Sequence, residues 1–203
     1  LIIIGLLSKF FNSKKIVIFH GHETLMGNII LNQISKYSIR GYDKIIAVSN
    51  FSSNLLNKIN LKNKINVLNN GFDLKRFKMF DVQKRKSDSD LVLITLGSLS
   101  DRKGQHNVIK ALPLLRKHYK RIKYHMVGPD NIKRKILDLA ISLNVQDLIH
   151  FHGYLDDKSL SELFSVSDIF IMLSENLPNG DVEGFGIAIL EANYFGLPAI
   201  GSK

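Results

Sequence analysis

The fold is decided by residues 91–105, which read LVLITLGSLSDRKGQ. The run Leu91–Leu96 is apolar without alternation, which is typical of a strand buried on both faces of a parallel sheet. It ends at Gly97, and the pattern predicts a helix that begins near Lys103 and bends or ends around Pro113. A buried strand followed directly by a helix is the repeating unit of an α/β fold.

The same alternation of strand and helix extends toward both ends of the chain. Upstream, we expect strands at Lys15–Phe19, Asp43–Val48 and Lys64–Leu68, and helices at Leu25–Tyr37 and from a Ser49 or Asn50 cap through Leu56. Downstream, we expect strands at Ile122–Val127, Leu148–Phe151, Asp168–Leu173 and Pro198–Ile200, and helices at Asn131–Leu143, Asp156–Val166 and Gly184–Phe195. The predicted fold class is therefore α/β with doubly wound parallel sheets, whose ligands bind at the carboxyl ends of the strands.

A polar, highly charged segment at residues 78–90 divides this pattern in two. We therefore expect residues 1–80 to form one part, residues 81–90 a linker, and residues 91–203 a second part. The chain opens with Leu1 and closes just after its last expected strand, so we interpret it as a fragment truncated at both ends.

The composition is that of an ordinary globular protein: 203 residues, 45% hydrophobic and 23% charged, with 14 Gly and no Cys. The lack of Cys excludes disulfides, Cys-ligated zinc and thiol nucleophiles, and it suits a reducing compartment. The longest apolar run, Leu1–Leu7, is far shorter than the ~20 residues that a membrane-spanning helix needs. The sequence also lacks the basic start and cleavage site of a signal peptide.

The net charge of +10 is unevenly distributed. Residues 1–80 contain 12 Lys and Arg against 3 Asp and Glu, whereas residues 81–203 contain 16 against 15. Codon bias is one interpretation of the basic first part, and attraction to an anionic membrane surface is another. Nucleic-acid binding is the weakest interpretation, because the sequence has no basic helix with interleaved aromatic residues and no zinc-finger spacing.

Two glutamates stand eight positions apart in residues 181–202, which read DVEGFGIAILEANYFGLPAIGS. The helix expected there is apolar nearly all round and should be largely buried, so the carboxylate of Glu191 needs a hydrogen-bonding partner. Eight residues of helix span about 12 Å, roughly the distance from one end of a sugar diphosphate to the ribose. The turn at residues 184–186 could offer backbone N–H groups to a diphosphate. Alternatively, Glu183 is a helix N-terminal charge and Glu191 an ion-paired core residue.

Arg102 and Lys103 stand at the start of the helix that follows the deciding strand. A phosphate bound there would gain from both the side-chain charge and the helix dipole. The alternative is an ordinary solvated helix start, since the loop is neither a Walker motif nor a GxGxxG fingerprint.

His20, His22 and Glu23 directly follow the first strand, at the ligand edge of a parallel sheet. A metal site is one interpretation, but neither an HExxH motif nor a Cys supports it. We favour a neutral histidine that bonds a substrate oxygen. For the other histidines we expect structural or surface roles; they are His106, His118, His125, His150 and His152.

Taken in order, five segments resemble glycosyltransferase family 4, the glycosyl transferases group 1. The segments are KIVIFHGHE, YDKIIAVSNFSSNLL, INVLNNGFDLKRF, LITLGSLSDRKGQ and DVEGFGIAILEANYFGLPAIG. The most specific element is the E-x7-E motif followed by Ala-x-x-x-Gly-x-Pro. The sequence DVEGFGIAILEA is similar to that of the phosphatidylinositol-mannosyltransferase-like branch.

The resemblance implies a GT-B fold with two Rossmann-like domains, both incomplete in this chain. Residues 1–80 would be the C-terminal part of the acceptor-side domain, and residues 91–203 the N-terminal part of the donor-binding domain. It also implies a retaining, metal-independent transferase that moves a sugar from a nucleotide-diphosphate sugar to a lipid-linked or saccharide acceptor. We expect no metal cofactor, no nucleic-acid partner, and a cytoplasmic protein with peripheral association at an anionic membrane face.

The resemblance also implies roles for individual residues. Lys103, helped by Arg102, would neutralise the donor diphosphate, which the backbone of residues 184–187 would cradle. Glu191 would bond the ribose hydroxyls, and the base would lie at Tyr154. The implied catalytic residues are His20 and Glu183, and the implied donor-binding residues are Arg102, Lys103, Tyr154, Gly184, Phe185, Gly186, Ile187 and Glu191.

One position departs from the family pattern, because Ser98 stands where many members carry an arginine. One of two expected phosphate-binding cations is therefore missing, which motivates an alternative function as a non-catalytic nucleotide-sugar-binding GT-B module. A GT-B relative that isomerises or phosphorolyses sugars is a second alternative, and a basic nucleic-acid binder is the weakest.

Overall fold

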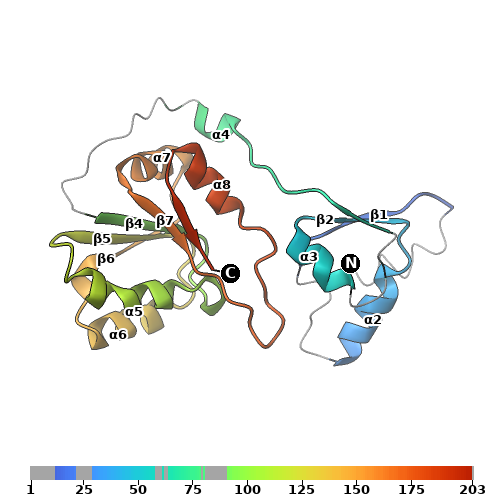
Figure 1. Cartoon of the computed structure of the whole chain (residues 1–203), viewed down its shortest axis with the longest axis horizontal. Helices are drawn as coiled ribbons and strands as arrows, with labels where there is room; N and C mark the ends of the chain where they lie inside the picture. Colours follow the sequence, from blue (N-terminus) through green and yellow to red (C-terminus); the bar gives the residue numbers. More distant parts are fainter. Residues whose placement is uncertain are drawn as a thin grey trace. The chain divides into compact units, whose positions relative to one another are not determined.

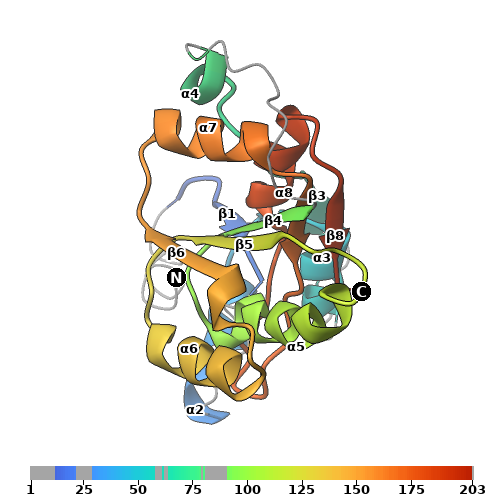
Figure 2. The ribbon, with the colours of Figure 1, turned by 90° about the vertical axis from the view of Figure 1, so that its left-hand side faces the viewer.

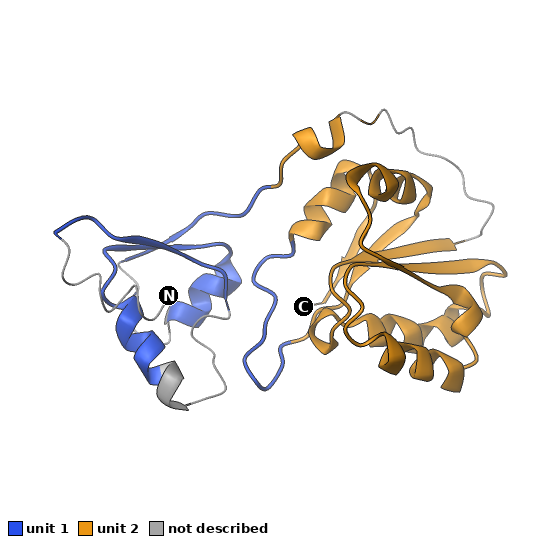
Figure 3. Ribbon diagram, turned by 180° about the vertical axis from the view of Figure 1, so that it is seen from behind, with its two compact units in different colours: residues 1–71, 176–186 blue, residues 72–175, 187–203 orange. Residues whose placement is uncertain are grey.

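The computed structural model describes residues 12–21, 29–57, 61, 64–78, 80 and 91–202. The chain divides into two compact units, shown in different colours in Figure 3. Unit 1 comprises residues 1–71 and 176–186, and unit 2 comprises residues 72–175 and 187–203.

Unit 1 contains a parallel sheet of three strands in the order β1-β2-β3, of which Figure 1 labels β1 and β2. Its elements are β1 (Ile16–Phe19), α2 (Ile29–Ile39), β2 (Lys44–Ala47), α3 (Asn50–Asn57) and β3 (Ile65–Val67). Phe19, Ile45 and Leu56 are fully buried in its core. The predicted cap of α3 is confirmed at Ser49, whose Oγ accepts a hydrogen bond from the backbone N–H of Ser52 at 3.0 Å.

Unit 2 contains a parallel sheet of five strands in the order β6-β5-β4-β7-β8. The strands are β4 (Leu91–Leu96), β5 (Ile122–Val127), β6 (Ile149–Gly153), β7 (Ile169–Met172) and β8 (Ala199–Gly201). From β4 the chain adds β5 and β6 on one side and then β7 and β8 on the other. The sheet is therefore doubly wound, as predicted, and its strand order reverses between β4 and β7.

Helices cover both faces of the unit 2 sheet (Figure 2). The helical elements of unit 2 are α4 (Lys75–Lys78), η3 (Asp101–Lys103), α5 (Gln105–Leu115), α6 (Lys133–Ser142), η4 (Gln146–Leu148), α7 (Asp157–Val166) and α8 (Ile187–Tyr194). The core beside α5 and α6 includes Leu93 and Tyr124, and the core beside α7 and α8 includes Ile94 and Phe170. Because both faces are buried, β4 has the unbroken apolar sequence on which the fold prediction rested.

Helix α5 ends at Leu115, two residues beyond Pro113, so the expected end around Pro113 is confirmed. One helix differs from the expectations drawn from the sequence. Helix α8 begins at Ile187 and not at Gly184, because Gly186 has a positive φ of 81° that is incompatible with an α-helix. The expectation that this helix is largely buried is wrong for its two ends, since Ile187 and Tyr194 are each more than 40% exposed. Its buried residues are Glu191 and Ala192, and the helix contacts β7 and β8.

Some expectations concern residues outside the described ranges. The expected linker at 81–90 lies there, as does the start of the helix expected from Leu25, whose described part is α2. Residues 75–78, which the sequence analysis assigns to the first part, lie in unit 2 as α4. Among the described residues, no helix is long and apolar enough to cross a bilayer.

Candidate functional site

The switch in strand order gives unit 2 a natural ligand edge. Open α/β sheets bind ligands beyond the carboxyl ends of their strands, at the point where the order reverses. Here that point lies between β4, which is followed by Gly97, and β7, which is followed by Leu173. The chain segments that leave these two strands therefore form the expected ligand edge of unit 2.

Lys103 lies across the end of β4. A Cβ atom at Gly97 would come within 3.2 Å of Lys103 Cε and 3.5 Å of its Nζ, so the absence of a side chain at Gly97 leaves room for the lysine. The same Nζ lies 3.8 Å from Sδ of Met172, at the end of β7. Lys103 is thus half-buried, and its ammonium group lies at the switch point, between the two strand ends.

The turn that carries Lys103 rests directly on the backbone that leaves β7. Gly104 has a φ of 70°, and a Cβ atom there would lie 1.8 Å from the carbonyl oxygen of Leu173. The backbone N–H of Glu175 donates a hydrogen bond to the carbonyl of Arg102 at 2.7 Å. Glycine at position 104 is therefore required both by its φ angle and by the close approach of the β7 exit.

The loop between β4 and the Lys103 turn is tied to α5 by Gln105, which is 1% exposed. Its side-chain amide donates to the carbonyl of Ser98 at 3.1 Å and accepts from the backbone N–H of Ser100 at 3.4 Å. The sequence analysis did not single out Gln105. A polar residue at the start of an amphipathic helix gives no local sign that the fold will bury it.

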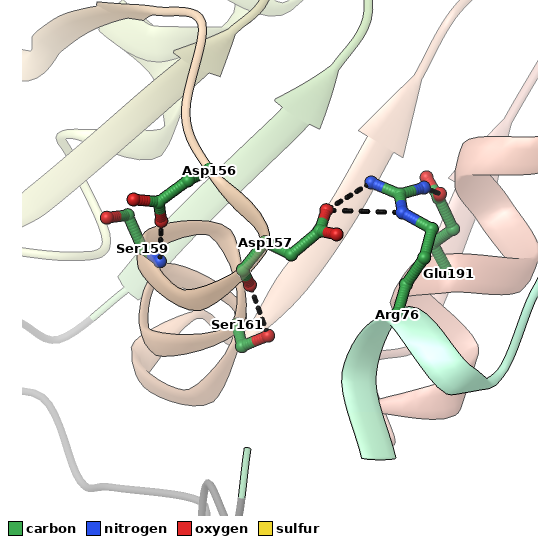
Figure 4. A network of polar contacts seen from close by, with 6 residues as sticks. All are labelled: Arg76, Asp156, Asp157, Ser159, Ser161 and Glu191. Atoms are coloured by element: carbon green, nitrogen blue, oxygen red, sulfur yellow. Dashed lines mark hydrogen bonds and ion pairs between the residues drawn. The ribbon is translucent and has the colours of Figure 1, made fainter. Parts of the chain in front are cut away.

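Glu191 is buried and ion-paired. Its Oε1 lies 2.5 Å from Nη1 of Arg76 in α4, and the same guanidinium bonds Asp157 Oδ1 through Nη2 at 2.5 Å and Nε at 3.1 Å (Figure 4). Burial raises the pKa of Glu191, although the charge of Arg76 opposes that effect. The structure therefore shows the partner that the buried carboxylate requires, and the ribose-binding role of Glu191 stays a prediction.

Arg76 is a site neighbour that sequence reasoning missed. A buried glutamate required a partner, but the sequence offers 28 Lys and Arg and does not say which one the fold supplies. Arg76 lies 115 positions before Glu191, in the segment INVLNNGFDLKRF.

Tyr154 follows β6 and is 83% exposed, so its ring is open to a planar ligand. Asp156, two residues after Tyr154, caps α7 by accepting a hydrogen bond from the backbone N–H of Ser159 at 2.7 Å. The exposed tyrosine therefore stands on a loop whose far end is held by a helix cap.

Five predicted residues belong to unit 1: His20, Glu183, Gly184, Phe185 and Gly186. His20 directly follows β1 and is exposed. A Cβ atom at Gly184 would lie 1.7 Å from the carbonyl oxygen of His20, so the segment that contains Glu183 packs against the end of β1.

Two serines of unit 1 hold this segment. Ser49 Oγ donates to the carbonyl of Gly184 at 2.6 Å, and Ser52 Oγ lies 3.3 Å from the same oxygen. Within unit 1 the structure thus brings His20 together with the segment around Glu183. The remaining predicted residues, Arg102, Lys103, Tyr154, Ile187 and Glu191, belong to unit 2. Since residues 183–186 precede α8, the 12 Å helical estimate does not apply to the two glutamates.

No group of three or more His, Asp or Glu in the described part of the chain is arranged to hold a metal ion. His22 and Glu23 lie outside the described residues. The expectation of metal-independent chemistry therefore stays a prediction.

A family model described as "Glycosyl transferases group 1" matches residues 77–203. Over 198 residues, the chain is 28% identical to an N-acetyl-alpha-D-glucosaminyl L-malate synthase of Bacillus anthracis, covering 94% of this chain and 50% of the relative. Over 200 residues, it is 26% identical to a GDP-mannose-dependent alpha-(1-6)-phosphatidylinositol monomannoside mannosyltransferase of Mycobacterium tuberculosis, covering 94% and 52%. The chain spans about half the length of the curated relatives it matches.

Among solved structures, the chain is similar to Anabaena Alr3699/HepE, crystallised in complex with UDP and glucose. The TM-score is 0.76 at 19% identity, and the match covers 98% of this chain and 56% of the other. This likeness concerns the fold: α/β with two parallel sheets, of the GT-B type that the motifs predicted.

Proposed function

Because the chain belongs to the glycosyl transferases group 1 family, we propose that the protein transfers a sugar from a nucleotide-diphosphate sugar to a lipid-linked or saccharide acceptor. We propose that the transfer retains the anomeric configuration and needs no metal ion. The observation that carries this proposal is the ammonium group of Lys103 at the β4–β7 switch point. The UDP and glucose of the Anabaena structure and the GDP-mannose dependence of the mycobacterial relative support the donor class.

The chemistry we propose is electrostatic. When the bond between sugar and diphosphate breaks, negative charge grows on the departing diphosphate, and a fixed cation lowers the energy of that state. Lys103 supplies the cation, with Arg102 next to it in the same turn. No side chain is assigned as a covalent nucleophile.

The remaining donor contacts follow from exposure and hydrogen-bonding capacity. Tyr154 offers an exposed ring on which the base can stack, a contact typically worth about 1–3 kcal/mol. Arg76 bonds Oε1 of Glu191, and a carboxylate accepts hydrogen bonds at both oxygens, so Oε2 is the proposed acceptor for a ribose hydroxyl. We assign contact with the transferred sugar to His20 and Glu183, and contact with the diphosphate to the backbone of residues 184–187.

The test is turnover of the intact protein with UDP-, GDP- and ADP-sugars, first screened by thermal stabilisation. Lys103→Ala should lower kcat/KM by about 30- to 150-fold, which corresponds to a loss of about 2–3 kcal/mol of transition-state stabilisation. Lys117→Ala, an exposed lysine after α5, is the matched control and should stay near wild type. Transfer should persist in EDTA. Turnover of Lys103→Ala within a few-fold of wild type, or loss of activity in EDTA that a divalent ion restores, would contradict the proposal.

Ser98 favours one second candidate, a module that binds nucleotide sugars without catalysis. In that case, thermal stabilisation by a nucleotide sugar and its loss in Lys103→Ala would both be seen, but neither transfer nor donor hydrolysis would be detected. Measuring binding and turnover on the same preparation therefore separates the two candidates.

We also propose a cytoplasmic location with peripheral membrane association. The excess of basic residues in the first 80 positions supports this association, together with the cavity of about 560 Å³ at the start of β1 and β2 that Lys14, Lys15 and Lys44 line.

A further inference from the structure

Glu175 makes contacts on two sides of the turn that carries Lys103. It lies three residues beyond the end of β7, and its backbone N–H donates to the carbonyl of Arg102 at 2.7 Å. The residue before it is held in turn, because the carbonyl of Ser174 accepts a hydrogen bond from Ser202 Oγ at 2.5 Å. The Lys103 turn is therefore joined through Glu175 to the carboxyl ends of both β7 and β8.

The side chain of Glu175 continues this connection into α5. Its Oε1 accepts a hydrogen bond from Nδ2 of Asn107 and lies 3.2 Å from Nε2 of His106. Nδ1 of His106 is buried and has no hydrogen-bond partner in the described part of the chain. Among the described residues, the contact with Glu175 is a polar contact that orients this imidazole.

The first turn of α5 is bonded back to the same loop. The backbone N–H of Asn107 donates to the carbonyl of Gly104 at 3.0 Å. One carboxylate thus ties the helix that follows Lys103 to the strand exit on which the Lys103 turn rests. Lysine has a long, flexible side chain, so the place of its ammonium group depends on how firmly the backbone beneath it is held.

We propose that Glu175 is a positioning residue for the phosphate-binding lysine: it holds the Lys103 turn so that the ammonium group stands at the switch point before the donor binds. This inference rests on the proposed function, in which Lys103 meets the donor diphosphate. Glu175 itself contacts no reacting group in this role. A group held in place beforehand stabilises developing charge without reorganising, so loss of the carboxylate should lower diphosphate affinity and turnover.

The test compares ligands that differ only in their phosphates. Calorimetry on the intact protein would use the tightest binder among UDP, GDP and ADP, together with the corresponding nucleoside. Glu175→Ala should lower the affinity for the nucleoside diphosphate at least 5-fold and leave the affinity for the nucleoside within 2-fold of wild type. Glu175→Gln keeps an acceptor oxygen for Asn107 and His106, so it should restore most of the affinity. Asp138→Asn, which breaks an exposed Arg134–Asp138 pair at 3.8 Å within α6, is the matched control and should match wild type.

A double-mutant cycle separates positioning from general structural support. If Glu175 acts through Lys103, then adding Glu175→Ala to Lys103→Ala should cost less than 2-fold in further affinity. Asn107→Ala removes the same hydrogen bond from the other side and should reproduce the loss if Glu175→Ala fails to fold.

Equal weakening of nucleoside and nucleoside diphosphate, or additive effects in the cycle, would overturn the inference. If Lys103→Ala itself leaves diphosphate affinity unchanged, the proposed function fails. If Lys103→Ala weakens binding and Glu175→Ala does not, only the positioning role fails.

Discussion

Arg76 neutralises a carboxylate that would be costly to bury alone. The Glu191 side chain is 7% exposed, whereas Asp157, the other partner of Arg76, is 39% exposed. Breaking a buried ion pair usually costs about 3–5 kcal/mol because an unpaired charge remains, and an exposed pair contributes about 0–1 kcal/mol. The two contacts of the same guanidinium therefore differ greatly in energy.

Arg76→Ala should lower the free energy of unfolding by about 2–3 kcal/mol at pH 7, a value reduced for the partial exposure of Arg76. Asp157→Asn should change it by less than about 1 kcal/mol. Burial raises the pKa of Glu191, and loss of Arg76 should raise it further. The folded variant then binds a proton more readily than the unfolded chain, so its stability should recover as the pH falls from 7 toward 5. Urea unfolding at both pH values measures this, and equal losses for the two variants would contradict it.

The roles of Glu183 and Glu191 should be distinguishable by which ligands each variant binds more weakly. Glu191→Gln should weaken both the bare nucleoside diphosphate and the sugar donor, because ribose is common to both. Glu183→Gln should lower turnover while the free energy of unfolding stays within about 0.5 kcal/mol of wild type. Calorimetry with both ligands decides the matter. If Glu183→Gln loses as much affinity for the bare diphosphate as Glu191→Gln does, the assignment of sugar to one and ribose to the other is wrong.

At the scale of elements, a histidine cluster joins the edge strand β6 to β5. His125 pairs in register with His150, their rings stack with centroids 5.0 Å apart, and His125 Nδ1 lies 2.8 Å from His152 Nε2. Burial, followed by the charges of His152, His150 and Lys123, lowers the pKa of His125 to about 4. Burial also lowers the pKa of His150 and His152. The cluster is therefore neutral in the folded protein at pH 7.

Acid should destabilise the fold through this cluster. The unfolded chain binds protons at these histidines near their ordinary pKa of 6.5, whereas folded His125 resists protonation down to about pH 4. Stability should therefore fall as the pH drops below 6.5, by about 1–2 kcal/mol after allowance for solvent screening. His125→Asn should flatten the dependence of Tm on pH between 7 and 5. The same slope in wild type and variant would show that other groups cause it.

At the scale of the whole molecule, the basic residues are concentrated in one part of the chain. Residues 1–80 contain 12 Lys and Arg against 3 Asp and Glu, and residues 81–203 are nearly balanced at 16 against 15. Three lysines of the first part, at positions 14, 15 and 44, line one cavity together with Asp43. An anionic surface attracts such a group by about 1 kcal/mol per cation near it.

The intact protein should bind anionic vesicles and release them as salt shortens electrostatic screening to ~8 Å. Replacing Lys14 and Lys44 by Glu should weaken binding to anionic vesicles, whereas replacing the exposed Lys117 and Lys158 of unit 2 by Glu should not. Vesicle sedimentation at rising salt measures both. Equal binding to neutral and anionic vesicles would assign the excess charge to codon bias.

The sequence alone determined the α/β class and the parallel sheets. The run Leu91–Leu96 is apolar without alternation because β4 is covered on both faces, and this pattern can be read within six consecutive residues. The same holds for the cap at Ser49 and for the family motifs. The predicted start of α8 at Gly184 is wrong because Gly186 adopts a positive φ, which the surrounding apolar pattern does not indicate.

Only the tertiary structure decided which distant groups meet. Arg76 pairs with Glu191 across 115 positions, and Glu175 reaches Arg102 and Asn107 across more than 60. His125 meets His150 because β5 and β6 are neighbours in register. Local propensity acts over one helical turn or one strand, whereas these partners are set by strand order and by which face of the sheet each residue occupies. Which residues contact one another around the switch point is therefore known only once the order of the strands is known.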